Sequence, residues 1–319
     1  MLASLFDNIS LRSLFAALLV SAVLLALCWW PELPYPDARL GGLASWGAAA
    51  RKGLGFGVLF LSALIFNEFL NRRRIFAGSY HFLPLLAALA SGVVLLPGAD
   101  AGWLYLPVHL ILIYRLLDLQ HSPDARYLYF DLGWITGLAG FAEAQFWFYL
   151  PLGWFLGVLL RHVNGRNFAA SLLGAVAMVF SVGALGDFTG YDGWGRLMHQ
   201  AQSLSITFGV NLPTWHGYHL LLGALLLLLL VQFPQRLQRA NAAQRQTFQF
   251  WYLMVLYGWL GYFFLGRPAS WSGLPLATTA WALAVLLSHW ENRWLRDGLY
   301  LSVWLVPVLA LLAHLGLFP

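Results

Sequence analysis

The sequence predicts an all-α integral membrane protein with about eleven transmembrane helices in one bundle. Three observations lead to this fold class. Of the 319 residues, 60% are hydrophobic and 10% are charged, whereas a soluble domain carries about 25% charged residues. Apolar segments of about 17–25 residues, the length that crosses a bilayer, recur from end to end. Arginine and lysine gather in alternate connections between these segments, as in a multi-pass topology.

The expected spans fill the whole chain, which we treat as one domain of residues 1–319. The first apolar stretch is too long for the core of a signal peptide and is expected to remain as the first span. One cysteine, Cys28, excludes an internal disulfide. The eleven spans are expected at about 12–30, 53–70, 80–97, 102–119, 128–141, 144–160, 167–186, 216–233, 248–265, 274–290 and 299–317.

The segment 128–166 is expected to form a tightly packed helical hairpin. Gly133 and Gly137 are four residues apart, and so are Gly153 and Gly157. In lipid, small residues at this spacing let helix backbones approach closely. The two apolar parts of the hairpin are therefore expected to pack through their glycines.

Positive charge fixes the expected orientation. Thirteen of the 18 arginines and lysines fall on one side of the spans, which we assign to the cytoplasm. The amino terminus is then inside and, because the span number is odd, the carboxyl terminus is outside. Two outer connections are long, 31–52 and 187–215. In the second, polar residues including Arg196 and His199 recur at helical spacing, which predicts an amphipathic helix in the interface plane.

The outer side also gathers acidic residues. Glu32 and Asp37 lie in the first long connection, and Glu143 lies in the tight turn of the hairpin. An acid beside a cation at a membrane interface could deprotonate an acceptor and hold a lipid phosphate. The alternative is that these are the solvated charges of polar loops. The candidate catalytic residues are Asp37, Glu32 and Glu143, and the candidate lipid- or phosphate-binding residues are Arg196 and His199.

Three histidines are candidate ligands of a metal ion. His216 and His219 share one face at a helix start, and His199 could complete a ligand set. Two histidines at such a position are more often solvated, so we expect no metal. The signatures of nucleotide sites, CxxC, HExxH and GxSxG are absent from the sequence. We therefore expect no cofactor, and the net charge of +5 is explained by topology rather than by nucleic acid.

Polar residues within the expected spans have structural interpretations. His109 is expected to form a hydrogen bond between helices, since a proton relay would need a matching chain of acids. Arg115 and Asp118 are spaced to form an ion pair. Asp131 is expected to cap a helix or to pair with Arg126 or Arg115.

Three stretches carry a resemblance to known proteins: FNEFLNRRRIF at 66–76, LILIYRLLDLQ at 110–120, and the glycine-rich hairpin with its Arg-Asn exit at 129–176. Together they resemble a family of bacterial multi-spanning inner-membrane proteins of unknown function, some of which carry a carotene-oxygenase label. The resemblance implies a location in the bacterial inner (plasma) membrane. Oxygenase activity is not expected, because a soluble propeller with four histidine ligands cannot be built from eleven apolar helices.

The hairpin also resembles a module of polytopic glycosyltransferases of the GT-C type. This resemblance implies a GT-C-like bundle, a polyprenyl-phosphate sugar as donor, and an acidic residue in the first external loop, where Glu32 and Asp37 lie. The chain departs from the pattern in three ways. The paired Asp-Glu is absent, Glu143 replaces the usual lysine after the Gly-Leu-Ala turn, and there is no large external domain.

Three function classes follow from these observations. The first is a non-catalytic role in envelope assembly or lipid-linked processes, with membrane lipids and an envelope protein as partners. The second is a GT-C-like glycosyltransferase that uses a lipid-linked sugar. The third is a transporter, which predicts a polar cavity at mid-depth lined by His109, Asp131 or Asn67.

Overall fold

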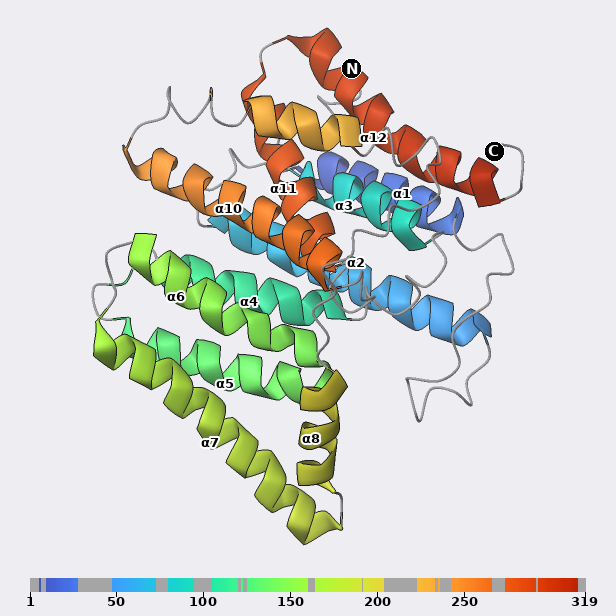
Figure 1. The fold of residues 1–319 in the computed structure, drawn as a ribbon. Helices are drawn as coiled ribbons and strands as arrows, with labels where there is room; N and C mark the ends of the chain where they lie inside the picture. Colours follow the sequence, from blue (N-terminus) through green and yellow to red (C-terminus); the bar gives the residue numbers. More distant parts are fainter. Residues whose placement is uncertain are drawn as a thin grey trace. The chain divides into compact units, whose positions relative to one another are not determined.

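A computed structural model of the chain is all-helical in the part that it describes (Figure 1). The structure describes residues 6, 10–27, 48–72, 80–94, 105–119, 122, 125–159, 164–190, 192–203, 223–232, 235, 242–265, 273–290 and 292–314. The all-α fold class is therefore confirmed.

Each of the eleven expected spans overlaps a helix, and a further helix, α8, lies in the long connection 187–215, where the sequence predicts an amphipathic one. The helices are α1 (Leu11–Leu27), α2 (Ala48–Arg72), α3 (Phe82–Val94), α4 (Leu106–Leu119), α5 (Arg126–Ala142), the 3₁₀ helix η4 (Ala144–Phe148), α6 (Tyr149–Leu159), α7 (Gly165–Thr189), α8 (Gly193–Ser203), the helix Gly223–Gln232, α10 (Ala242–Phe264), α11 (Gly273–His289) and α12 (Arg293–His314).

Two of the described helices are long and apolar enough to cross a membrane, namely Gly165–Gly186 in α7 and Arg293–Leu312 in α12. Only 28% and 33% of their apolar windows are buried, so most of this apolar surface lies on the outside of the protein. Other apolar helices have 10–17 residues, which is shorter than the roughly 20 residues that a span needs. The count of eleven spans therefore stays a prediction.

The helices form two compact units. Unit 1 comprises Met1–Pro107, Val210–Tyr262 and Arg267–Pro319, and unit 2 comprises Val108–Gly209 and Phe263–Gly266. Unit 1 holds α1, α2, α3, α11, α12, the helix Gly223–Gln232 and almost all of α10, whereas unit 2 holds almost all of α4 and all of α5 to α8. The sequence predicts that all helices form a single bundle. This would require the two units to associate, and it stays a prediction.

Unit 2 is built on the contact between α5 and α7, which run in the same direction (Figure 1). A Cβ atom on Gly133 would overlap the backbone carbonyl of Ser171, and one on Gly174 would overlap the carbonyl oxygen of Phe130. The two backbones are therefore in direct contact, which the absence of side chains allows. The close approach predicted at Gly133 is confirmed, but its partner is α7 and not the second helix of the hairpin.

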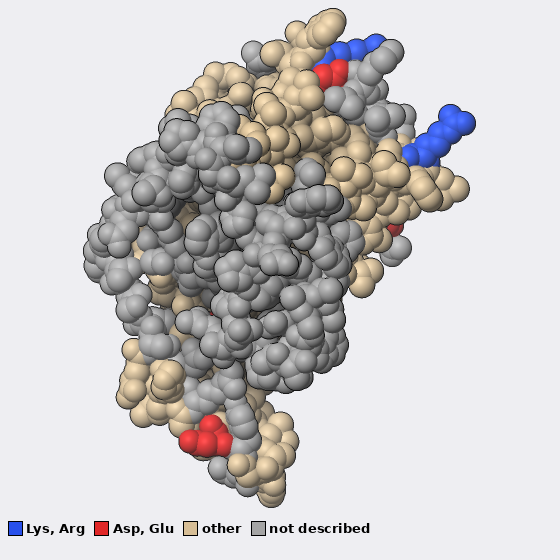
Figure 2. Space-filling view, turned by 90° about the vertical axis from the view of Figure 1, so that its right-hand side faces the viewer, with Lys and Arg blue, Asp and Glu red and all other residues tan. Residues whose placement is uncertain are grey.

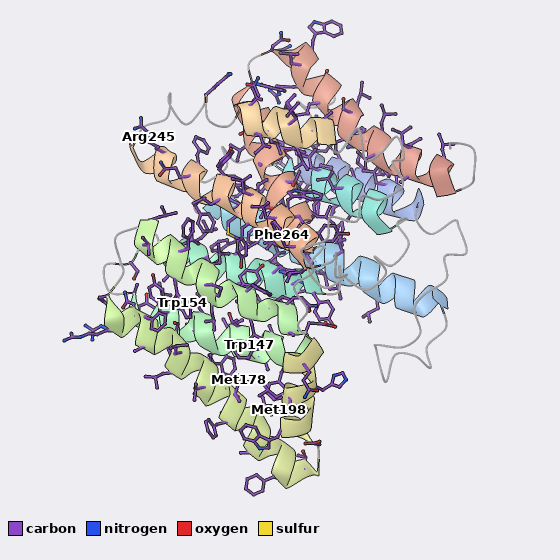
Figure 3. All side chains as sticks on the ribbon, in the orientation of Figure 1. Trp147, Trp154, Met178, Met198, Arg245 and Phe264 are labelled. Atoms are coloured by element: carbon purple, nitrogen blue, oxygen red, sulfur yellow. The ribbon has the colours of Figure 1, made fainter. Side chains whose placement is uncertain are left out.

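The contact of α5 with α6 is made differently. A Cβ atom on Gly153 of α6 would meet the side chain of Leu132, so here a leucine fills the space above a glycine. The indole Nε1 of Trp154 donates a hydrogen bond of 2.8 Å to the Ser171 hydroxyl on α7. Figure 3 labels Trp154 on α6 and Met178 on α7. A leucine side chain and one polar bond thus tie α6 to the α5–α7 pair.

Unit 1 is built around α3. Every residue from Phe82 to Ala90 is buried, as expected for a helix that is apolar on all sides. Helices α1, α2, α11 and α12 all contact it. Between α10 and α11, the rings of Trp251 and Trp281 stack with centroids 3.8 Å apart. Large aromatic rings thus fill most of the space at this contact, although Gly258 of α10 also lies close to the backbone of Pro275 on α11.

Candidate functional site

Of the five candidate site residues, the structure describes Glu143 and His199 in full and Arg196 by its backbone. Glu32 and Asp37 lie outside the described residues. Glu143 lies between α5 and η4, whereas Arg196 and His199 lie on α8. All three positions belong to unit 2.

Glu143 occupies the turn where α5 ends. Its backbone is extended, with φ −147° and ψ 123°. Its N–H donates to the Ala139 carbonyl at 3.0 Å, and its carbonyl accepts from the Phe146 N–H at 3.1 Å. Nearby, the indole of Trp147 covers Gly140 so closely that a Cβ atom there would overlap the ring. The tight turn predicted at Glu143 is confirmed, and its side chain is half-buried.

The end of α7 and the start of α8 are set by local signals. Gly190 has φ 71°, a left-handed conformation that glycine adopts without strain and that ends α7. Asp192 then caps α8, since its Oδ1 accepts a hydrogen bond of 2.7 Å from the N–H of Gly195. The indole of Trp194 lies against Gly183 of α7. These contacts hold α8 firmly on the end of α7.

Helix α8 crosses the end of unit 2 at which α5 finishes (Figure 1). It contacts α5, η4 and α7, and its residue Gly193 is buried. Leu197 lies on the same face as Gly193, whereas His199 is about 200° further around the helix than Leu197 and is exposed. The structure therefore brings α8 and the turn at Glu143 to one end of unit 2, but it turns His199 outward.

His109 forms the hydrogen bond between helices that the sequence predicts. Its Nδ1 lies 2.7 Å from the hydroxyl of Tyr149 on α6. Both residues are fully buried, and the ring of Phe146 lies 4.8 Å from the imidazole. The arrangement holds α4 against α6.

A second pair of the same kind lies in unit 1, and sequence reasoning missed it. The Nδ1 of His81 lies 2.5 Å from the hydroxyl of Tyr300 on α12, and both side chains are fully buried. The ring of Phe6 lies 5.4 Å from that of Tyr300. The two partners are 219 residues apart, so no local pattern could have joined them. The one available signal was a histidine at the start of an apolar segment.

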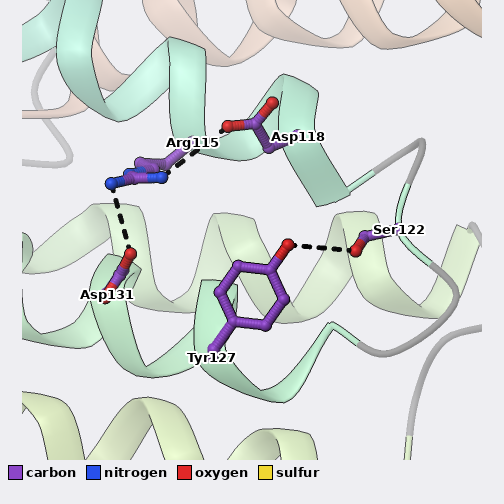
Figure 4. Close-up of polar contacts among 5 residues, drawn as sticks. All are labelled: Arg115, Asp118, Ser122, Tyr127 and Asp131. Carbon is purple, nitrogen blue, oxygen red and sulfur yellow. Dashed lines mark hydrogen bonds and ion pairs between the residues drawn. The ribbon is translucent and has the colours of Figure 1, made fainter.

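Arg115 joins two carboxylates in unit 2 (Figure 4). Its guanidinium lies 3.2 Å from Asp131 on α5 and 3.8 Å from Asp118 on its own helix. The predicted pair of Arg115 with Asp118 is confirmed, and of the alternatives left open for Asp131 the structure shows the pair with Arg115. The hydroxyls of Ser122 and Tyr127 lie 3.3 Å apart near the same α4–α5 connection. These contacts tie α4 to α5.

On the face drawn in Figure 2, few described residues are basic or acidic. Among the residues that the structure describes, no group of three histidine, cysteine, aspartate or glutamate side chains could hold a metal ion. His216 and His219 lie outside the described residues. In unit 2, the side chains of His109, Trp154 and Arg115 use polar groups to join helices.

Comparison of the chain with protein-family models, with curated proteins and with solved structures finds no match. In the part of the chain that the structure describes, the observations define an all-α protein with two helices that are long and apolar enough to cross a membrane.

Proposed function

We propose that the chain is a multi-pass protein of the bacterial inner membrane that acts without catalysis, in envelope assembly or in lipid-linked processes. The exposed apolar surface of its longest helices carries the proposal. On α7, Leu173 and Phe180 are 62% and 61% exposed. A soluble protein would have to hide such a surface, whereas lipid chains cover it without cost.

The organisation of the polar groups supports the non-catalytic part of the proposal. His109 is bonded to Tyr149, and Arg115 is paired with Asp131. His199, a candidate phosphate ligand, is exposed on the far side of α8 from Leu197. Side chains that join helices make a rigid scaffold. A transporter, in contrast, would need His109 and Asp131 to line a polar cavity.

A topology experiment tests the location. Cys28 is the one cysteine of the chain, so a Cys28→Ala background permits single cysteines to be placed at will. A cysteine in place of Arg73 should react with an impermeant maleimide only after the cells are opened. One in place of Thr189, which is exposed just beyond the outer end of the expected span 167–186, should react in intact spheroplasts. Labelling of both positions from the same side, or release of the protein by alkaline carbonate, would refute the proposed topology.

A complementation experiment tests the absence of catalysis. In a strain that lacks the protein and is stressed by detergent, we expect the variants Glu32→Gln, Asp37→Asn and Glu143→Gln each to restore growth. Gly133→Val, which forces α5 from α7, should fail. If the carboxylate variants fail although their abundance in the membrane is normal, the non-catalytic role is wrong.

One observation favours a second candidate, a GT-C-like glycosyltransferase. Glu143 and the helix that carries Arg196 lie at the same end of unit 2. An acid and a cation at a membrane interface are what transfer from a lipid phosphate requires. In this case Asp37 or Glu32 would act as the base, with Arg196 or His199 near the phosphate. Transfer of a labelled sugar from a polyprenyl-phosphate donor by the purified protein would establish this activity.

A further inference from the structure

Helix α1 of unit 1 has two unlike faces. Its inward face carries small residues, with Ser13, Ala17 and Ser21 all buried, and the helix packs against α3 and α12. Its outward face carries bulky apolar residues, and Leu11 and Phe15 are 84% and 72% exposed. A helix with this pattern turns its hydrocarbon side chains away from the protein, as a lipid-facing helix does.

A groove lies along the outward face. It has a volume of about 490 Å³ and is lined by Leu11, Arg12, Phe15, Ala16 and Leu19. The groove is shallow and open over most of its extent, and its described lining comes from one face of α1. From Arg12 to Leu19 the groove follows about 10 Å of helix at 1.5 Å per residue. Its lining is hydrocarbon except at the end where Arg12 lies.

Among the residues that the structure describes, the charged end of the groove has no counter-ion. Arg12 is exposed and lies in the first turn of α1. A cation is unfavourable there, because the amino-terminal end of a helix is itself electropositive. The first turn of α1 holds no acidic residue, and no described acidic side chain pairs with Arg12. An anion at this end would interact favourably with both the guanidinium and the helix end.

We propose that this groove binds an anionic phospholipid, with the phosphate on Arg12 and one acyl chain along Phe15, Ala16 and Leu19. The two ends of the groove match the two parts of such a lipid in charge and polarity. The proposal rests on the proposed membrane location. There the orientation puts Arg12 at the cytoplasmic leaflet, whose lipids are negatively charged.

Native mass spectrometry of the full-length protein in detergent tests the proposal, with phosphatidylglycerol and phosphatidylcholine as the added lipids. A basic residue near an anionic surface contributes roughly a fivefold preference. We therefore expect the first phosphatidylglycerol to bind about fivefold more tightly than phosphatidylcholine. Arg12→Gln should abolish the preference. Ala16→Trp, which fills the groove, should weaken binding of both lipids.

The control for Arg12 is Arg293→Gln, since Arg293 is also an exposed arginine in the first turn of an apolar helix. This variant should keep the preference. If Arg12→Gln prefers phosphatidylglycerol as the unchanged protein does, or if Ala16→Trp binds lipid normally and melts normally, the site does not exist. The measurement is made in detergent, so its result does not depend on how the protein is oriented in a membrane. A failure here therefore differs from release by alkaline carbonate, which would refute the membrane location instead.

Discussion

The two units fill the space between their helices in opposite ways. In unit 2, α5 and α7 meet through backbone, and Gly133 and Gly174 leave no room for a side chain. In unit 1, α10 and α11 meet through the stacked rings of Trp251 and Trp281. Phe66 of α2 adds an edge-on contact to Trp251 at 6.4 Å. The α5–α7 contact of unit 2 therefore requires residues without side chains, whereas the α10–α11 contact of unit 1 requires large ones.

This difference predicts which kind of substitution destabilises each unit. A close backbone contact has no soft part, because a carbonyl group in a helix cannot rotate away. A stack of large rings, in contrast, tolerates small shifts but loses many contacts if one ring is removed. Unit 2 should thus be damaged mainly by larger residues and unit 1 mainly by smaller ones. Both units share one device, a buried His–Tyr hydrogen bond beside a phenylalanine ring.

The largest effect is expected from Trp251→Ala in unit 1. Trp251 is fully buried and contacts the rings of Trp281, Phe66 and Phe250. The cavity left behind should cost about 4 kcal/mol of unfolding free energy. Denaturation in mixed micelles measures the loss, and hydrogen exchange locates it. Faster exchange is expected in α10 and α11. Equal acceleration in α5 and α7 would contradict the distinction between the units.

Gly133→Val should have the next largest effect. Its side chain would overlap the carbonyl of Ser171, so α5 and α7 must separate, at a cost of about 3 kcal/mol. Gly137→Ala is the milder comparison, because a Cβ atom there would lie 3.1 Å from the Met178 Cβ. We expect that variant to cost about 1 kcal/mol. The same denaturation experiment ranks the two, and an equal cost would show that the backbone contact is not special.

The His–Tyr pairs should give smaller and similar effects. Tyr149→Phe and Tyr300→Phe each remove one buried hydrogen bond, of 2.7 and 2.5 Å. A polar bond between apolar helices contributes about 1 kcal/mol. Replacing the histidine as well, in His109→Phe with Tyr149→Phe, should recover part of the loss, since no buried imidazole is then deprived of the Tyr149 hydroxyl. A double-mutant cycle in each unit measures the coupling, which would vanish if the bonds were incidental.

How much of this could be predicted follows from which signals are local. Apolar runs predict helices, and small residues four apart predict a close contact at Gly133 and Gly137. The spacing does not predict which helix is the partner. The contact of α5 with Ser171 and Gly174 of α7 is recognised only once the helices are placed in space. The ion pair of Arg115 with Asp131 could be predicted as one of a few alternatives, because the two residues lie on helices that follow each other in the sequence.

The candidate site shows the same limit. The turn at Glu143 follows from the break between two apolar segments, and α8 follows from the polar spacing in its sequence. The outward position of His199 depends on which face of α8 meets α5 and η4, and that is a tertiary property. The bond of His81 with Tyr300 spans 219 residues. Without homologous sequences, no pattern in one chain links two such positions.

The smallest effect is expected from Gly165→Ala, because Gly165 is a glycine of unit 2 that takes no part in the backbone contact. Gly165 is the first residue of α7, the helix that also carries Gly174, but a Cβ atom at Gly165 would have nothing within 4 Å. The N-cap bond from the Asn167 N–H to the Asn164 side chain stays intact. Alanine favours the helical state over glycine, so the unfolding free energy should change by less than about 0.5 kcal/mol or rise slightly. A loss as large as that of Gly133→Val would mean that α7 tolerates no substitution anywhere, and the backbone contact would then explain nothing particular to Gly133.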